Sequence, residues 1–240
     1  MFSFLYHSFV FNPLYNGLIL LMDILPWIDA GIAVIIFTII VRFILFPLSR
    51  KAIVTQVMMK RIEPEINKIK SSMANDRQGQ ALKMMALYKE KGVSPFSSFF
   101  VLLLQLPIIF ALYSIFFQSG LPEVNTDILY SFINTPIVDM NFLGIIDIGA
   151  KSIILALIAA VAQYLQLHYS VSASQTISSS GSGNSQADMA QNMMKNMKYI
   201  FPVMVFFISY KISAVVALYW TVSSLFTLAQ ELYVRKKLAV

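Results

Sequence analysis

Five hydrophobic stretches separated by polar segments divide the chain. The hydrocarbon core of a bilayer is crossed by about 20 helical residues at a rise of about 1.5 Å each. The stretches approach or reach that length, so they predict transmembrane helices over 31–49, 95–118, 151–169, 199–212 and 214–234. The expected fold class is an all-α polytopic membrane protein with five transmembrane helices.

Residues 1–30 are apolar but do not form a simple sixth stretch. Asn12-Pro13 and Asn16-Gly17 interrupt the apolar run, and the run has no basic n-region before it. A cleaved signal peptide normally begins with a basic region. We interpret 1–30 as an outer-side interfacial segment, with an N-terminal interfacial helix over roughly 14–25 that lies on the membrane. A sixth span is the alternative.

The segment 50–94, between the first two stretches, predicts a helical hairpin. Its first arm, 50–73, places apolar residues on one face, namely Ile53, Val57, Ile62, Ile66 and Ile69. Pro64 predicts a kink or a restart of this arm. Asn75-Asp76 indicates the turn, and Gly92 the end of a second helix over 77–91.

Charge gives the orientation. The stretch from Arg50 to Lys91 contains ten basic and four acidic residues, so it alone equals the net charge of +6. Under the positive-inside rule this hairpin is cytoplasmic, as is the basic tail 235–240. The outer loop 119–150 contains four acidic residues and no Lys or Arg. Five spans then place the N-terminus outside and the C-terminus inside, and we expect a multi-pass protein of the cell membrane.

The segment 170–198 begins with a Ser/Gly-rich run typical of a flexible linker, here a cytoplasmic loop. Methionines then recur at helical spacing, at Met189, Met193, Met194 and Met197. They indicate an amphipathic approach to the fourth span, or a soft surface for varied apolar partners. Residues 199–210 would rise only about 18 Å as a helix. Either this helix continues back through Met193, or the membrane is thin around it.

Composition limits the function classes. The chain is 58% hydrophobic and 12% charged, with a mean hydropathy of +0.70, which excludes a soluble domain. It has no cysteine, and therefore no disulfide framework or thiol nucleophile. Gly-x-Ser-x-Gly and His-Glu-x-x-His motifs are absent, and the two histidines, His7 and His168, lie near helix ends. We expect no enzyme activity, no catalytic residue, no metal and no cofactor.

Arg42 is the most informative residue. It lies inside the first span, toward its cytoplasmic end, where an arginine costs about 2.5–3.5 kcal/mol on insertion scales. No Asp or Glu lies deep in any predicted span, and Glu231 is only at the inner end of the last. The side chain either extends to the interface or lines a hydrated, functional cavity. We favour the cavity.

Polar residues that can line such a cavity occur in the other spans. Thr38 lies one turn before Arg42 on the same helix face. The others are Gln105 in the second span, Gln163 and Gln166 in the third, and Ser223, Ser224, Thr227 and Gln230 in the fifth. Each alone is more often a contact between helices than a substrate contact.

In order and spacing, motifs over about 200 residues resemble the YidC family of membrane protein insertases. The motifs are Thr38-x-x-x-Arg42, Phe46-Pro47-Leu48, Ile62-Glu63-Pro64-Glu65-Ile66, Met84-Met85-Ala86-Leu87-Tyr88-Lys89, Gly92-Val93-Ser94-Pro95, Leu104-Gln105-Leu106-Pro107-Ile108, Ala111-Leu112-Tyr113, Leu218-Tyr219-Trp220-Thr221-Val222-Ser223 and Gln230. The chain departs from the family pattern at Ser94-Pro95-Phe96 and at Ser213-Ala214-Val215, which concerns the turn between the last two spans.

The resemblance implies a five-helix core with a hydrophilic groove, open to the cytoplasm and to lipid. Arg42 would attract the polar or acidic tail of a client protein, and neither ATP nor a metal would be required. The implied groove residues are Arg42, Thr38, Gln105, Gln163, Tyr219, Trp220, Ser224 and Gln230. The implied partners are nascent membrane proteins, with the Sec translocon as a further candidate, and neither a specific nucleic acid nor a small-molecule substrate.

The basic hairpin has two interpretations, one without a binding partner and one with a partner. It is a solvated face, or it docks to anionic lipid headgroups or to the ribosome through Lys60, Arg61, Lys68, Lys70, Lys83 and Lys89. The main rival for the whole chain is a secondary transporter or channel with Arg42 in its solute path. No internal repeat supports that rival. A passive assembly scaffold would tolerate the loss of Arg42.

Overall fold

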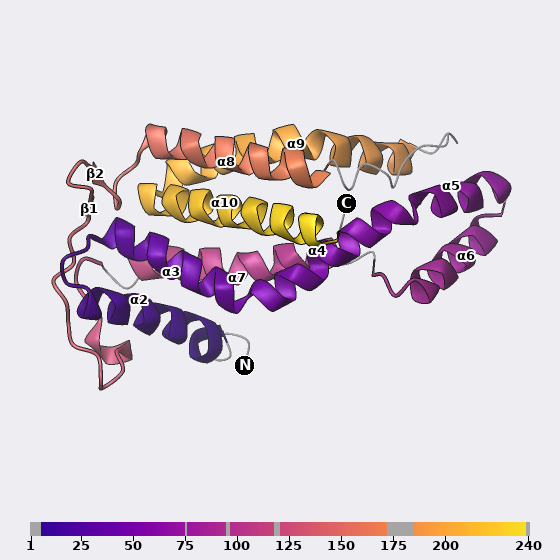
Figure 1. Ribbon diagram of the computed structural model, residues 1–240. Helices are drawn as coiled ribbons and strands as arrows, with labels where there is room; N and C mark the ends of the chain where they lie inside the picture. The colour runs from indigo at the N-terminus through magenta and orange to yellow at the C-terminus, as the bar shows by residue number, and fades with distance from the viewer. Residues whose placement is uncertain (1–5, 75, 95–96, 118–120, 172–184, 239–240) are drawn as a thin grey trace.

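The computed structural model describes residues 6–74, 76–94, 97–117, 121–171 and 185–238. Among these residues, a bundle of helices lies side by side along one axis (Figure 1). They are α3 (Ala30–Ile44), α7 (Ser97–Phe117), α8 (Ile153–Val171), α9 (Ser185–Ile212) and α10 (Ala214–Lys237). A loop with two short strands lies at one end of this bundle, and a helical hairpin projects from the other end.

Several of these helices are long and apolar enough to cross a bilayer. Within the described ranges, Ile153–Ser170 and Ala214–Lys237 meet that condition alone. Ala30–Ile44 meets it together with Phe46–Met59 of α4 (Phe46–Arg61), and the two are bent by 64°. Helix α7 contributes the shorter apolar stretch Gln105–Phe116. The chain is therefore a mostly helical, multi-pass membrane protein, and the count of five spans stays a prediction.

The bend between α3 and α4 follows from Pro47. Proline has no N–H to donate to a carbonyl one turn earlier, and its ring crowds that carbonyl. Helix α3 accordingly ends at Ile44, and α4 begins at Phe46 after Leu45. The bend leaves Arg42 in the last turn of α3.

Helix α9 continues well before residue 199. It runs without a break over 28 residues, or about 42 Å at the usual rise per residue. Of the two alternatives, the helix continues back through Met193. A helix of this length gives no reason to expect a thin membrane. The side chains of 185–197, including the four methionines, lie outside the described residues, as does most of the Ser/Gly-rich run. A single residue, Ser213, separates α9 from α10.

At its N-terminal side the chain forms a π-helical turn (His7–Phe11) and α2 (Asn12–Ile24), close to the predicted 14–25. Pro13 lies in the first turn of α2, where its missing N–H costs little. The buried face of α2 carries Tyr15, Leu18 and Ile19 and packs on α3 and α7.

The outer loop joins three helices through hydrogen bonds. Its strands β1 (Asn141–Phe142) and β2 (Ile146–Asp147) are antiparallel, a feature that the hydrophobic pattern did not predict. The Ala30 N–H at the start of α3 donates to Asp139 O (2.8 Å), and the Ala214 N–H of α10 donates to Ala150 O (2.8 Å). In α2, Asn16 Nδ2 donates to Ile128 O (2.8 Å). The loop is therefore bonded to α2 and to the first residues of α3 and α10.

Glycine is required where this loop meets α3. A Cβ atom added at Gly31 would lie 2.4 Å from the Phe142 ring. Phe142 thus packs directly on the α3 backbone, beside Asp29, whose side chain accepts the Ile32 N–H at the start of the helix (2.8 Å). The other Asp29 oxygen accepts the Leu143 N–H (3.0 Å) in the turn between the strands.

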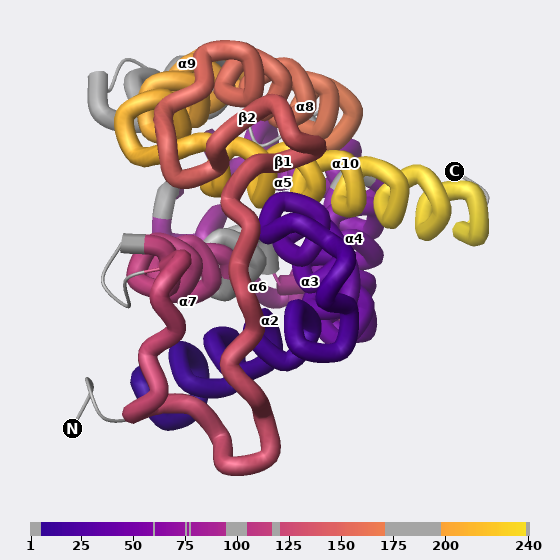
Figure 2. The backbone as a smooth tube through the Cα atoms, turned by 90° about the vertical axis from the view of Figure 1, so that its left-hand side faces the viewer, coloured from indigo at the N-terminus to yellow at the C-terminus, as the bar shows by residue number. Residues whose placement is uncertain are grey.

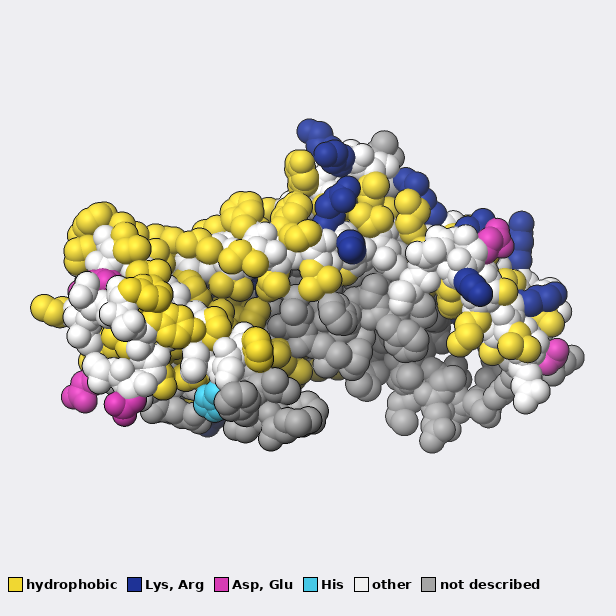
Figure 3. Space-filling view, turned by 90° about the horizontal axis from the view of Figure 1, so that it is seen from below, with side chains coloured by type: hydrophobic (Ala, Val, Ile, Leu, Met, Phe, Trp, Pro, Cys, Tyr) yellow, Lys and Arg dark blue, Asp and Glu magenta, His cyan; other side chains and the backbone are white. Residues whose placement is uncertain are grey.

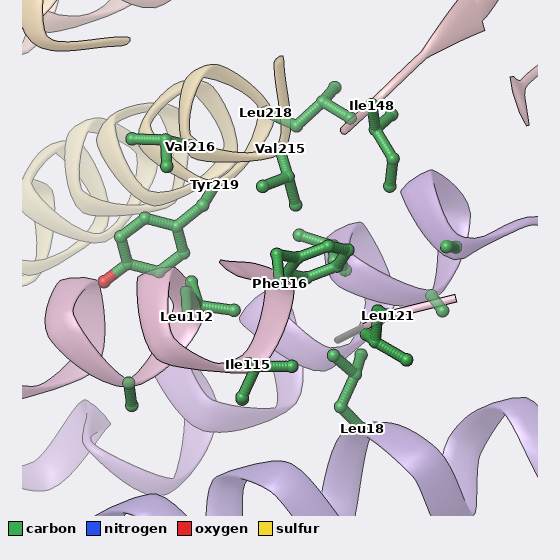
Figure 4. Packing of buried hydrophobic residues seen from close by; sticks show 14 of the residues in the cluster. Leu18, Leu112, Ile115, Phe116, Leu121, Ile148, Val215, Val216, Leu218 and Tyr219 are labelled. Atoms are coloured by element: carbon green, nitrogen blue, oxygen red, sulfur yellow. The ribbon is translucent and has the colours of Figure 1, made fainter. Parts of the chain in front are cut away.

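Helix α10 is the centre of the bundle. It contacts α3, α4, α7, α8 and α9. Seen along the bundle, α8 and α9 lie on one side of α10, and α3 and α7 lie on the other, with α2 beyond them (Figure 2). The apolar core continues between these layers, where Leu112 and Phe116 of α7 face Val215 and Tyr219 of α10 (Figure 4).

The hairpin has its own small core. Helix α4 is followed by α5 (Glu63–Ser72), with Pro64 in the first turn of α5, and by α6 (Arg77–Glu90). The predicted apolar stripe is confirmed, since Ile53, Val57, Ile62 and Ile66 are buried and Ile69 is half-buried. Gly92 ends α6 at φ +62°, with the Val93 N–H bonded to Tyr88 O (3.0 Å), a left-handed helix end that favours glycine.

Candidate functional site

Arg42 lies in a network of neutral polar side chains from three helices. Its Nη2 donates to Gln105 Oε1 of α7 (2.6 Å) and to Ser223 Oγ of α10. Gln105 Nε2 in turn donates to the Tyr219 hydroxyl (2.7 Å) and to Ser223 Oγ (3.3 Å). Tyr219 and Ser223 are buried, whereas Arg42 and Gln105 are half-buried. We call these four residues the arginine network.

The arginine network leaves the charge of Arg42 uncompensated. Within the described part of the chain, no carboxylate oxygen lies within 4.0 Å of its guanidinium. Its Nη2 bonds to Gln105 and Ser223, and the Tyr219 hydroxyl is a further hydrogen-bond partner of the guanidinium. Its partners among the described residues are therefore neutral side chains.

The surface beside Arg42 is apolar. Exposed hydrophobic side chains flank it on α3 and α7, namely Ile40, Phe43, Ile44, Leu106 and Phe110. An exposed apolar surface of this kind suits lipid or an apolar partner. The charge thus lies beside an exposed apolar surface of the bundle.

A second set of contacts joins α4 to α10, beyond the bend that follows α3. Ser49 of α4 and Gln230 of α10 bond through Gln230 Nε2 to Ser49 Oγ (2.7 Å), and Gln230 Nε2 also donates to Phe46 O (3.2 Å). The separation of 181 residues that joins Arg42 to Ser223 also joins Ser49 to Gln230. We call these two pairs the register contacts. Because they lie on either side of the bend at Leu45, α10 holds both halves of the bent span in one register.

The predicted groove residues Gln163, Trp220 and Ser224 form a separate network. Gln163 Oε1 accepts from Trp220 Nε1 (3.1 Å) and from Ser224 Oγ (3.0 Å), and Gln163 Nε2 donates to Gln166 Oε1 (2.6 Å). Gln163, Trp220 and Ser224 are buried between α8 and α10. Thr38 is also buried, and its hydroxyl donates to Val34 O of its own helix (2.6 Å). These four residues do not bond to Arg42.

Replacing Gln163 with leucine should lower stability. The substitution leaves the Trp220 N–H and the Ser224 hydroxyl buried without their acceptor, at a cost of about 1–3 kcal/mol. Thermal unfolding in detergent measures the cost. An unchanged midpoint of unfolding would contradict this account.

An ion pair lies near the C-terminal end of α10. Glu231 and Arg235, one turn apart on α10, bond to each other, and Glu231 also accepts from the Ser170 hydroxyl of α8. Arg235 Nη2 donates to Ser170 O (3.5 Å). The Glu231 carboxylate is buried, whereas the Arg235 side chain keeps 20% of its surface exposed. Ser170 was not predicted as a site residue, and no motif singles it out.

The predicted hairpin cations lie on its surface. Arg61, Lys68, Lys83 and Lys89 are exposed, and Lys70 is half-buried. The Lys60 side chain lies outside the described residues. Arg61 Nη2 donates to Leu238 O at the C-terminal end of α10 (3.1 Å). Between the arms, burial raises the pKa of the Tyr88 hydroxyl.

These features define a polytopic helical membrane protein that holds an arginine inside its bundle on neutral partners. The chain matches the family model described as 60Kd inner membrane protein over residues 21–239. It is 32% identical over 232 residues to "Membrane protein insertase YidC" of Fusobacterium nucleatum subsp. nucleatum, covering 96% of this chain and 98% of that protein.

Two further relatives carry the same name. The protein of Clostridium tetani is 32% identical over 212 residues, covering 88% of this chain and 84% of the relative. The protein of Wolinella succinogenes is 30% identical over 208 residues, covering 87% of this chain and 34% of the longer relative. The chain therefore belongs to the YidC family of membrane protein insertases.

Proposed function

We propose that this protein inserts transmembrane segments of client proteins into the bilayer, and that Arg42 attracts the polar or acidic tail of the client. The observation that carries the proposal is the uncompensated charge. An arginine held by the neutral side chains Gln105, Ser223 and Tyr219 keeps its charge for a carboxylate.

The electrostatic attraction is strong enough to matter. At 4 Å and an effective dielectric constant of about 20, two unit charges interact with about 4 kcal/mol. A tail carboxylate near Arg42 thus recovers part of its desolvation cost on entering the membrane. Burial of about 20 apolar client residues then drives the insertion, so ATP is not needed.

The remaining parts of the proposal concern topology and partners. Five spans place the N-terminus outside and the C-terminus in the cytoplasm of a cell whose plasma membrane holds the protein. The hydrophilic groove would be closed at the outer end, where the loop with β1 and β2 joins three helices. The hairpin would contact anionic lipid or the ribosome, and the Sec translocon is a further candidate partner.

The test is insertion of a one-span client with an acidic outer tail into liposomes that contain the purified protein. We expect protection of the tail from added protease in these liposomes, well above the level in empty ones. Solute flux is measured in the same vesicles. Absence of tail protection across several clients would contradict the proposal, and solute flux that depends on Arg42 would favour a transporter.

A further inference from the structure

Helix α4 and the C-terminal end of α10 form one basic surface from segments far apart in the sequence. The two segments are tied at both ends, by the Ser49–Gln230 bonds and by the bond from Arg61 to Leu238 O. They carry five exposed cations, namely Arg50, Lys51, Arg61, Lys236 and Lys237. We call this set the inner basic surface. The acidic residue of these two segments, Glu231, is buried and paired with Arg235.

The inner basic surface lies where the apolar surface of the bundle ends. Lys and Arg side chains gather with hydrophobic ones over α4 and the end of α10, apart from those over α5 and α6 (Figure 3). The positive-inside rule requires basic residues on this side of the membrane. It does not require two distant segments to bring them onto one surface.

Each of the two helices repeats the same order of side chains along its face. On α10, exposed Leu232 and Tyr233 lie one turn before Lys236 and Lys237. On α4, exposed Leu48 lies about one turn before Lys51. Along each helix, in the direction from the bundle to the hairpin, the exposed apolar side chains thus lie about one turn before the lysines.

The geometry points to a binding site for an anionic phospholipid of the inner leaflet, with its phosphate on the inner basic surface and its acyl chains on the apolar residues one turn away. A phospholipid needs both elements in this order, whereas RNA needs the cations but gains nothing from exposed Leu48 and Leu232. An acidic peptide also lacks the long apolar part. This inference names a lipid partner for the proposed insertase, but lipid binding is measured without any client.

The test is lipid retention by the full-length protein in detergent, measured by native mass spectrometry. We expect phosphatidylglycerol to be retained at least about tenfold more strongly than phosphatidylcholine. Two variants remove two charges each from the surface, Lys236→Gln with Lys237→Gln, and Arg50→Gln with Lys51→Gln. Because the site is shared between the helices, each should weaken phosphatidylglycerol retention several-fold.

A matched control removes two exposed charges elsewhere. Lys151→Gln with Lys211→Gln acts at the end of the bundle where the outer loop lies. This control should leave phosphatidylglycerol retention within about twofold of wild type. All these side chains are exposed, so the fold should tolerate the changes, and Lys236→Arg with Lys237→Arg should keep retention.

Four results would overturn the inference. They are an equal loss in the control variant, a loss in only one of the two surface variants, no preference for phosphatidylglycerol, and RNA or acidic-peptide binding that depends on these residues while lipid retention does not. Failure of client insertion with normal lipid retention would count against the proposed function and leave this site in place.

Discussion

Replacing Arg42 with alanine should slow the translocation of an acidic client tail by about tenfold or more. A tenfold change corresponds to about 1.4 kcal/mol, a fraction of the attraction available near a guanidinium in a medium less polar than water. The readout is the initial rate of tail protection in liposomes. Arg42→Lys should be intermediate, because it keeps the charge but loses the planar guanidinium whose Nη2 bonds Gln105 and Ser223.

The control for this experiment is a client whose tail acids are replaced by their amides. If Arg42 acts through charge, the variant and wild-type proteins should insert this neutral client at similar rates. The difference between the two clients then isolates the charge–charge contribution, as in a double-mutant cycle. An equal defect with both clients would assign Arg42 a structural role, and no defect with either would contradict its proposed role.

Among substitutions of the ion-paired residues, Arg235→Met should lower the stability of the folded protein most. Methionine keeps most of the apolar stem but leaves Glu231 buried with only the Ser170 hydroxyl as a partner. An uncompensated buried charge of this kind costs about 3–5 kcal/mol. We expect the midpoint of thermal unfolding in detergent to fall by roughly 10 °C.

Two comparisons sharpen that experiment. Glu231→Gln should cost less than Arg235→Met, because the Arg235 side chain that remains is partly exposed and can be hydrated. Lys91→Met removes the charge that pairs with Glu65 at 3.4 Å. In that pair the Lys91 side chain is 35% exposed and the Glu65 side chain is 48% exposed. The substitution should therefore change stability by less than about 1 kcal/mol. A larger cost for Glu231→Gln would contradict this account.

Much of the fold follows from local patterns in the sequence. The stripe from Ile53 to Ile66 predicts the buried face of α4 and α5, because apolar residues at helical spacing need a common partner surface. Gly92 ends α6 because its left-handed backbone favours glycine. The outer loop was not predictable in this way. It is joined to α3 and α10 largely by backbone groups, which every residue carries, and the Asp29 and Phe142 side chains that add to the contact belong to no pattern that indicates their partners.

The site was predicted as one set of polar residues but consists of two. Tyr219 and Ser223 lie one turn apart on α10 and face Gln105, whereas Trp220 and Ser224 are each one residue further along and face Gln163. One residue along a helix turns the side chain by about 100°. Helical geometry alone therefore separates the two sets. Which set meets Arg42 depends on how α3 and α8 pack, and the sequence pattern does not contain that.

The register contacts couple the lengths of two distant segments. Deleting one residue of α10 between Ser223 and Gln230 would turn all that follows by about 100° and carry Gln230 away from Ser49. Only a matching deletion between Arg42 and Ser49 would bring the partners back, and that segment contains Pro47 and the bend. A substitution at one of these positions leaves the other contact in register. A change in the number of residues between them, made in one helix alone, displaces the later contact.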